Sequence, residues 1–486
     1  MQKRFLYLIV AVSLLFSMTF VAACGPTEAP PAEEEQEEVV VEEETEEEEM
    51  VEGFDWRQVE GTELTVFLNE TPMAVAIREN IDEFTELTGI EIDYLVVAEN
   101  EYWSKLSIDL SSGAGEFDVF MSGASLNWGY SAANQIQPLD PFMDDPTLTP
   151  DDWDYEDFYD WAISSQRWDG TPGPEGLGAG ELWALPINAV NSIITYRQDI
   201  FDEYDIAVPD TWEDWSNAAY EIQEKTGGEV DGQPFYSVAM RGAADFTTLS
   251  GPFVSGLFSY GASDFNEDLT PAMNEPLAVE YQKLYMDVIK DTGTPEWPSQ
   301  MWFDVQNGFG SGQYAMVFDV ADFVPTFEGE GSAVAGKLGY ALPPAGPDGF
   351  RNSFPWCWGF SMNSQAEDDT AKAAWLFIMW ASSKDTMVTF AEQGTWPTRE
   401  SVWNDPSVVE YTNQFGDGQF REVVTEVQNE HAEWLVAPMT DLGAVWTIWV
   451  NGLHDYYFDK GSMQEIMDQV AEDVTEQLLS SGTLQQ

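Results

Sequence analysis

Between residues 60 and 125 the chain alternates between two periods of apolar and polar positions. Segments with a period of two, typical of strands, are separated by segments with a period near 3.6, typical of amphipathic helices. The pattern predicts strands at 63–68, 90–97 and 117–121 and helices at 74–88 and 101–112. Because strand and helix alternate, we predict an α/β fold with a mostly parallel sheet flanked by helices.

The rest of the chain continues this mixture without a fixed-period repeat. A helix is expected to begin near Thr211, which can cap it, and Asp214 three residues later makes a weak capping box. The other segments are an extended stretch at 185–196 and helices at 197–204, 276–292, 370–382 and 461–479.

The first residues have the pattern of a secretory signal. Lys3 and Arg4 precede an apolar run at 5–21, which ends in small residues directly before Cys24. Residues 21–24 resemble a bacterial lipobox, which implies that residues 1–23 are removed and that Cys24 carries a lipid anchor. The alternative is an ordinary signal-peptidase site with an incidental cysteine. An acylated Cys24 would leave Cys357, the only other cysteine, without a disulfide partner.

The composition changes abruptly after the cysteine. Residues 25–56 begin with prolines and continue as an almost unbroken glutamate run at 33–49. Such a segment cannot bury enough apolar surface to fold, so we interpret residues 24–60 as a lipid-anchored, disordered and self-repelling linker. A calcium-binding acidic tail is the alternative interpretation.

The formal net charge of −70 at pH 7 excludes nucleic acid as a partner. A surface this acidic remains folded most easily where salt screens its self-repulsion, which suggests a saline habitat. About 430 residues follow the linker, too many for one compact core, so two large lobes are expected.

Five stretches in their order resemble the family of extracellular solute-binding proteins, group 1, whose members serve ABC importers. In the first, Phe117 stands where the family usually has proline. The stretches are 115–120 (GEFDVF), 184–186 with 196–201 (ALP, YRQDIF), 209–212 (PDTW), 310–318 (GSGQYAMVF) and 393–399 (QGTWPTR).

The resemblance implies a two-lobed, class II periplasmic-binding-protein-like fold, in which each lobe is a mostly parallel sheet flanked by helices and hinge strands join the lobes. Crossings are expected near 188–193, near 356–362 and near residue 405. The implied organisation is a first lobe at 61–190, a second lobe at 191–356, a return to the first lobe at 357–405 and C-terminal helices of the second lobe at 406–486.

Candidate ligand contacts follow from strand ends and from the resemblance. Ligands of such sheets bind beyond the carboxyl ends of the strands, and sugars need flat aromatic faces together with directional hydrogen-bonding groups. The strand ends indicate Asn69, Glu70, Ser122, Ser125 and Trp128. The positions implied by the resemblance are Asn188, Asn191, Asp319, Asp322, Trp356, Trp358, Trp446 and Trp449.

These candidates have alternative interpretations. Most of the twenty tryptophans are expected in the core. Arg241 is a further candidate, because it can donate two hydrogen bonds to adjacent hydroxyls or to a carboxylated sugar, but it can equally pair with Asp245 or another acid. Asn188 and Asn191 can bind ligand or satisfy backbone groups.

The resulting hypothesis is a monomeric binding protein without a metal or cofactor, which captures a carbohydrate or sugar alcohol by hinge closure and delivers it to an ABC permease. A polyamine, peptide or metal-ion receptor is the alternative within binding proteins. A secreted glycoside hydrolase is the alternative among enzymes, but only His431 and His454 are present, and the G-x-S-x-G, H-E-x-x-H and P-loop motifs are missing.

Overall fold

The computed structural model describes residues 53–484, which belong to one compact unit. The predicted signal, Cys24 and the glutamate run lie outside the described residues, so these remain predictions. Residues 53–60, expected in the linker, instead form a turn in which Val59 is buried against the folded body. No helix of the described part is long and apolar enough to cross a membrane.

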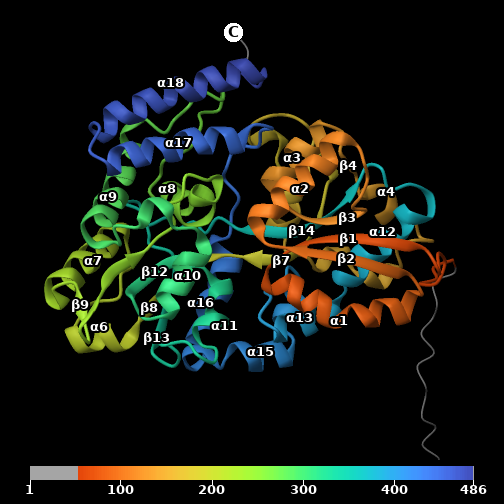
Figure 1. The fold of residues 1–486 in the computed structure, drawn as a ribbon, viewed down its shortest axis with the longest axis horizontal. Coiled ribbons are helices and arrows are strands. Elements are labelled where there is room, and N and C mark those ends of the chain that lie inside the picture. The colour runs from red at the N-terminus through yellow and green to blue at the C-terminus, as the bar shows by residue number, and fades with distance from the viewer. Residues whose placement is uncertain (1–52, 485–486) are drawn as a thin grey trace, which may run out of the picture. The chain divides into compact units, whose positions relative to one another are not determined.

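The first sheet has six strands in the order β2-β1-β3-β14-β4, with β7 also paired to β14 (Figure 1). β1 is parallel to β2 and β3, whereas β14 is antiparallel to β3, β4 and β7. Five strands therefore run in one direction and β14 runs against them. The strands are β1 (Glu63–Asn69), β2 (Glu91–Val97), β3 (Val119–Gly123), β4 (Ile136–Gln137), β7 (Leu185–Val190) and β14 (Trp356–Asn363).

The second sheet has four strands in the order β11-β12-β8-β13. β11 is parallel to β12, and β8 is antiparallel to both of its neighbours, so one strand is again reversed. The strands are β8 (Ser192–Arg197), β11 (Tyr236–Ala239), β12 (Tyr314–Val320) and β13 (Leu338–Ala341). The two reversed strands, β8 and β14, each follow a passage of the chain between the sheets.

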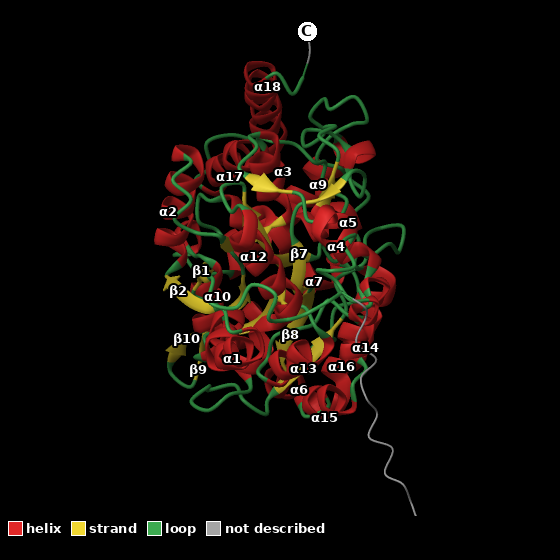
Figure 2. Cartoon of the chain, turned by 90° about the vertical axis from the view of Figure 1, so that its right-hand side faces the viewer, coloured by secondary structure: helices red, strands yellow, loops and turns green. Residues whose placement is uncertain are grey.

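Helices surround both sheets (Figure 2). On the first sheet lie α1 (Pro72–Thr88), α2 (Glu99–Ser112), α3 (Ala124–Ala132) and α12 (Asp368–Ala381), and α13 (Lys384–Glu392) packs on α1 and α12. The other helices are α4 (Asp140–Met143), α5 (Asp160–Gln166), α6 (Gln198–Tyr204), α7 (Trp212–Thr226), α8 (Val254–Ser259), α9 (Pro276–Thr292), α10 (Trp302–Gly310), α11 (Val324–Phe327), α14 (Glu400–Trp403), α15 (Pro406–Thr412), α16 (Gln419–Glu426), α17 (Leu442–Tyr457) and α18 (Met463–Ser481). Short strand pairs are β5 (Arg167–Trp168) with β6 (Glu181–Leu182) and β9 (Glu229–Val230) with β10 (Gln233–Pro234).

The capping residues explain where several helices begin. Thr71 precedes α1 and its hydroxyl accepts the Ala74 amide at 3.3 Å, while Gly89 ends the helix with a left-handed φ of 71°. The capping box predicted at Thr211 is confirmed, because the Thr211 hydroxyl accepts the Asp214 amide and the Asp214 carboxylate accepts the Thr211 amide, both at 3.1 Å.

One sequence-based segment prediction differs from the structure. The third strand begins at Val119, and Phe117 stacks on Phe67 with ring centroids 4.0 Å apart. The stretch at 185–196 is extended as predicted, and its crossing between the sheets lies within the predicted range 188–193. It divides at Asn191, because β7 pairs in the first sheet and β8 in the second.

The chain thus passes from the first sheet to the second between Val190 and Ser192 and returns between Ala341 and Trp356. The first passage is fastened by Ser353, whose hydroxyl accepts the Ser192 amide at 2.8 Å. α13 packs on α1, whereas α16 packs on β13, so the chain crosses again between these two helices.

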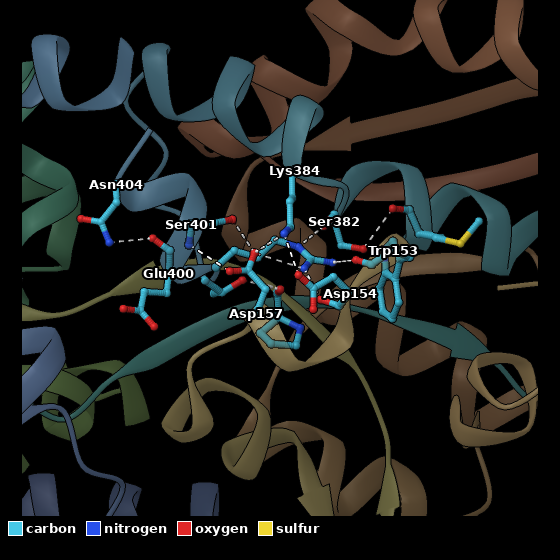
Figure 3. A network of polar contacts seen from close by, with 12 residues as sticks. Trp153, Asp154, Asp157, Ser382, Lys384, Glu400, Ser401 and Asn404 are labelled. Atoms are coloured by element: carbon cyan, nitrogen blue, oxygen red, sulfur yellow. Dashed lines mark hydrogen bonds and ion pairs between the residues drawn. The ribbon is translucent and has the colours of Figure 1, made fainter. Parts of the chain in front are cut away.

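A network of polar contacts, in which Figure 3 labels Trp153, Asp154 and Ser382, joins the segments around the last passage. Arg399 is fully buried and donates to the carbonyls of Trp153, Asp154 and Ser382 at 2.9, 2.5 and 2.7 Å. Its guanidinium also lies 3.9 Å from the ring centroid of Phe158. Burial lowers the pKa of Arg399 to about 10, a value that still leaves it charged at neutral pH.

Candidate functional site

A cavity of about 320 Å³ lies between the two sheets. The first sheet and its helices contribute Glu70, Thr71, Met73, Glu99, Trp103, Asn188, Val190, Trp356 and Trp358, together with Thr395. The second sheet and its helices contribute Arg241, Phe246, Thr247, Ser250, Trp302, Gln306, Val320, Asp322 and Phe323. The chain segments that position the wall are the ends of strands and the first turns of helices, where ligand sites of such sheets form.

Six of the residues predicted as ligand contacts lie together in this wall. They are Glu70, Asn188, Arg241, Asp322, Trp356 and Trp358. Their role as ligand contacts remains a proposal, but the sequence argument does bring them to one place.

Four candidates from strand ends of the first sheet are not in the wall. Asn69 is fully buried, and its amide has no hydrogen-bond partner within the described residues. Ser122 donates to the Asn127 side chain at 2.6 Å, and Trp128 packs edge-on against Trp434 with centroids 5.6 Å apart. Ser125, the fourth, is half-buried.

The candidates Trp446 and Trp449 lie in the core of the second lobe and not in the cavity wall. Both are fully buried on α17, which packs against α9 and α18. The indole of Trp449 donates to Gln282 of α9 at 2.7 Å, so its polar atom is already satisfied by the protein. Asn191 is buried at the passage between β7 and β8, also outside the wall.

Arg241 is held by a buried ion pair. Its Nε and Nη2 donate to the two carboxylate oxygens of Asp319 at 2.9 and 2.5 Å, and Nη1 donates to the carbonyls of Thr247 and Ser250 at 3.2 and 3.4 Å. Asp319 lies behind the wall rather than in it. The partner is thus Asp319 and not Asp245, whose carboxylate caps the turn at Thr247.

Aromatic rings from both lobes cover the wall. Trp103 stacks on Trp358 with centroids 5.9 Å apart, and Trp302 stacks on Phe323 at 6.2 Å. A Cβ on Gly123 at the end of β3 would lie 2.2 Å from the ring of Trp356, so this glycine makes room for the indole.

The sequence argument missed Glu99, Trp103 and Trp302. Glu99 and Trp103 follow the end of β2, so applying the strand-end rule to the second strand would have indicated them. Trp302 begins α10, and no strand end precedes it directly, so no comparable signal marks it.

Glu99 connects the two lobes across the cavity. One of its oxygens accepts the Trp103 indole N–H of the same helix at 3.2 Å, and the other accepts the indole N–H of Trp302 from α10. The described structure therefore has the lobes in contact around the cavity.

Three residues of the cavity wall carry a buried polar atom without a partner in the described part of the protein. Asp322 Oδ1, Trp356 Nε1 and Thr395 Oγ1 are buried and lack hydrogen-bond partners in the described residues. Burial raises the pKa of Asp322 to about 8, and the neighbouring Asn188 side chain offsets part of the rise. Asp322 is therefore largely a neutral acid at pH 7, which can both donate and accept a hydrogen bond.

A possible metal-ligating group lies elsewhere. Glu426, Glu430 and His431 have ligand atoms within 4.8 Å of one another at the end of α16, and both glutamates are exposed. None of the three lines the cavity.

A family model described as bacterial extracellular solute-binding protein matches residues 69–388. The Erythritol/L-threitol-binding protein of Mycolicibacterium smegmatis is 31% identical over 359 residues, which are 72% of this chain and 73% of that protein. The family model covers the strands of both sheets except most of β1, and all of the wall residues named above except Thr395.

Solved structures share the fold. A solute-binding protein of Agrobacterium radiobacter K84 in complex with ribitol superposes with a TM-score of 0.73 at 20% identity, covering 86% of this chain and 99% of the other. The maltose-bound binding protein of T. maritima gives a TM-score of 0.71 at 18% identity, covering 86% and 100%. The predicted two-lobed α/β fold is confirmed, and the chain belongs to the bacterial extracellular solute-binding protein family.

Proposed function

We propose that this chain captures a sugar or sugar alcohol in the cavity between its lobes and delivers it to an ABC permease. The observation that carries the proposal is the set of buried, unpartnered polar atoms on Asp322, Trp356 and Thr395, placed beside indole rings. The hydroxyl groups of a polyol can form hydrogen bonds with these polar atoms, and its C–H surface can pack on the indole rings.

The similar proteins support this ligand class. The relative from Mycolicibacterium smegmatis is named for erythritol and L-threitol, and the two similar structures hold ribitol and maltose. A cavity of about 320 Å³ is of the size that encloses a small solute.

The setting of this activity follows from the family, whose members act outside the cytoplasm and are not enzymes. We further propose that Cys24 carries the lipid anchor, that the acidic segment after it serves as a spacer, and that the receptor works as a monomer without enzymatic activity. Mass spectrometry of the membrane-extracted protein tests the anchor, because a diacylated Cys24 adds the mass of its lipid chains.

Tryptophan fluorescence tests the ligand class directly, since four half-buried indoles line the cavity. Titration with erythritol, ribitol, mannitol and maltose should change the emission saturably for at least one of them. Trp356→Ala should weaken that binding by more than about 1 kcal/mol, because it removes a stacking face and an N–H donor.

Trp56→Ala is the matched control, because Trp56 packs against Phe54 outside the cavity wall. It should leave the dissociation constant unchanged. The proposal fails if none of these carbohydrates binds, or if the Trp356 and Trp56 variants bind as tightly as each other.

A further inference from the structure

The cavity wall carries a strongly unequal set of charges. Its ionisable side chains are the carboxyl groups of Glu70, Glu99 and Asp322 and the single guanidinium of Arg241. The wall therefore offers three carboxyl groups, of which that of Asp322 is largely neutral at pH 7, and one guanidinium.

Most of the hydrogen-bond donors of Arg241 are already used within the protein. Arg241 donates from Nε and Nη2 to Asp319 and from Nη1 to two backbone carbonyls. Its side chain is about 10% exposed. These bonds use four of the five N–H donors, so the guanidinium cannot also bind a carboxylate or a phosphate through two parallel hydrogen bonds. The ion pair leaves no net positive charge at this point of the wall.

Glu99 has the opposite property. No lysine, arginine or histidine of the described residues lies within ion-pair distance of the Glu99 carboxylate, and its two hydrogen-bond donors are the uncharged indoles of Trp103 and Trp302. A carboxylate has about four acceptor positions, so two remain. Glu99 is thus an uncompensated acid flanked by two aromatic side chains.

Both indoles meet Glu99 through their N–H edges, so the two acceptor positions that remain on this carboxylate are the places where an ammonium group of a solute can pair with it. We propose that the cavity selects an amino-substituted sugar or sugar alcohol, seats its ammonium group against Glu99 between Trp103 and Trp302, and rejects carboxylated and phosphorylated sugars. This inference rests on the proposed capture of a polyol or sugar and adds the charge of the solute to it.

The test uses three six-carbon compounds that differ at one position, namely glucitol, its 1-amino-1-deoxy derivative glucamine, and gluconate. Their dissociation constants are measured by calorimetry at pH 7. Glucamine should bind about 10-fold or more tightly than glucitol, and gluconate about 10-fold or more weakly.

The long-range field of a highly acidic protein attracts any cation. Two controls therefore distinguish this general attraction from specific binding of the ammonium group at Glu99. The preference for glucamine should persist in 0.5 M KCl, where the Debye length is only about 4–5 Å. Butylamine, which has the ammonium group but no hydroxyls, should bind at least about 100-fold more weakly than glucamine.

Glu99→Gln tests the position of the seat. It should bring the affinities of glucamine and glucitol to within about 3-fold of each other. Glu101→Gln, on the same helix but exposed and outside the wall, is the matched control and should keep the wild-type preference.

The outcomes separate this inference from the proposed function. If no sugar or polyol binds, the proposed function itself is wrong. If glucitol binds but gluconate binds as tightly, or glucamine no more tightly, the function stands and the charge selection is overturned. A preference that survives in Glu99→Gln overturns the assignment of the seat to Glu99.

Discussion

Single side chains of the cavity wall show how burial changes their chemistry. Asp322 has no basic partner in the described structure, so removal from water favours its neutral form and raises its pKa from 3.8 to about 8. Arg241, which lines the same cavity, is paired with the carboxylate of Asp319. The pKa of Asp322 is thus raised because no basic side chain of the described residues lies beside this buried acid.

Asp322 makes stability depend on pH in a direction that can be measured. Between pH about 4 and 8 the unfolded chain releases this proton while the folded chain keeps it, so rising pH favours unfolding. Relative to Asp322→Asn, the wild type should lose up to about 1.4 kcal/mol of unfolding free energy per pH unit in this window. Urea unfolding at pH 5, 7 and 8.5 measures the difference.

The asparagine variant removes the titrating proton at nearly constant volume, so the two proteins should differ little at pH 4. An identical pH dependence of both proteins would contradict the proton assignment. If Asp322→Asn lost unfolding free energy faster with rising pH than the wild type, the predicted direction of the pH dependence would be wrong.

The tryptophans show what the sequence can and cannot predict about single residues. Trp356 and Trp358 are placed in the wall by their position on the predicted crossing strand. The sequence indicates Trp446 and Trp449 as candidates in the same way. They lie on α17, which packs on α9 and α18, and they are outside the cavity wall. Helical periodicity marks a buried face without telling whether protein or ligand covers it.

At the scale of elements, long periodic segments with capping residues are predicted well. α1, α7 and α9 begin or end within two residues of their predicted bounds, because Thr71, Thr211, Gly89 and Pro276 act locally. The break at Asn191 is not predictable in this way, since residues 185–196 are extended and apolar on both sides of it and only sheet pairing separates β7 from β8.

Arg399 gives a test of how elements far apart in sequence are joined. Its guanidinium satisfies three backbone carbonyls from two segments, and the carboxylate of Asp157 lies 3.4 Å away. Lysine has one nitrogen in place of a planar fork, so Arg399→Lys should leave buried carbonyls unpaired and cost about 2–4 kcal/mol in urea unfolding.

Arg78→Lys is the control, because Arg78 is exposed on α1. Its unfolding free energy should stay within about 0.5 kcal/mol of the wild type. Equal effects of the two substitutions would mean that the network shown in Figure 3 contributes no more than a surface arginine.

At the scale of the whole molecule, charge dominates. With 88 acids and 18 lysines and arginines, most carboxylates cannot have a basic partner. Their mutual repulsion is greater in the folded protein than in the expanded chain, and it is weakened by salt.

The unfolding free energy should therefore rise as KCl is increased from about 0.05 to 1 M at pH 7, as expected for a protein from a saline habitat. The same series at pH 4 serves as a control, because protonation of carboxylates removes part of the repulsion and should flatten the curve. A flat or falling curve at pH 7 would contradict this explanation.

The hydrogen bond between Glu99 and Trp302 has a consequence for solute exchange. It joins the lobes across the cavity, so the lobes cannot separate without breaking it. A solute that uses the two free acceptor positions of Glu99 leaves this hydrogen bond intact, whereas its release from between the lobes requires the bond to break. The residence time of a solute therefore depends on the strength of an indole–carboxylate bond as well as on the contacts that the solute itself makes.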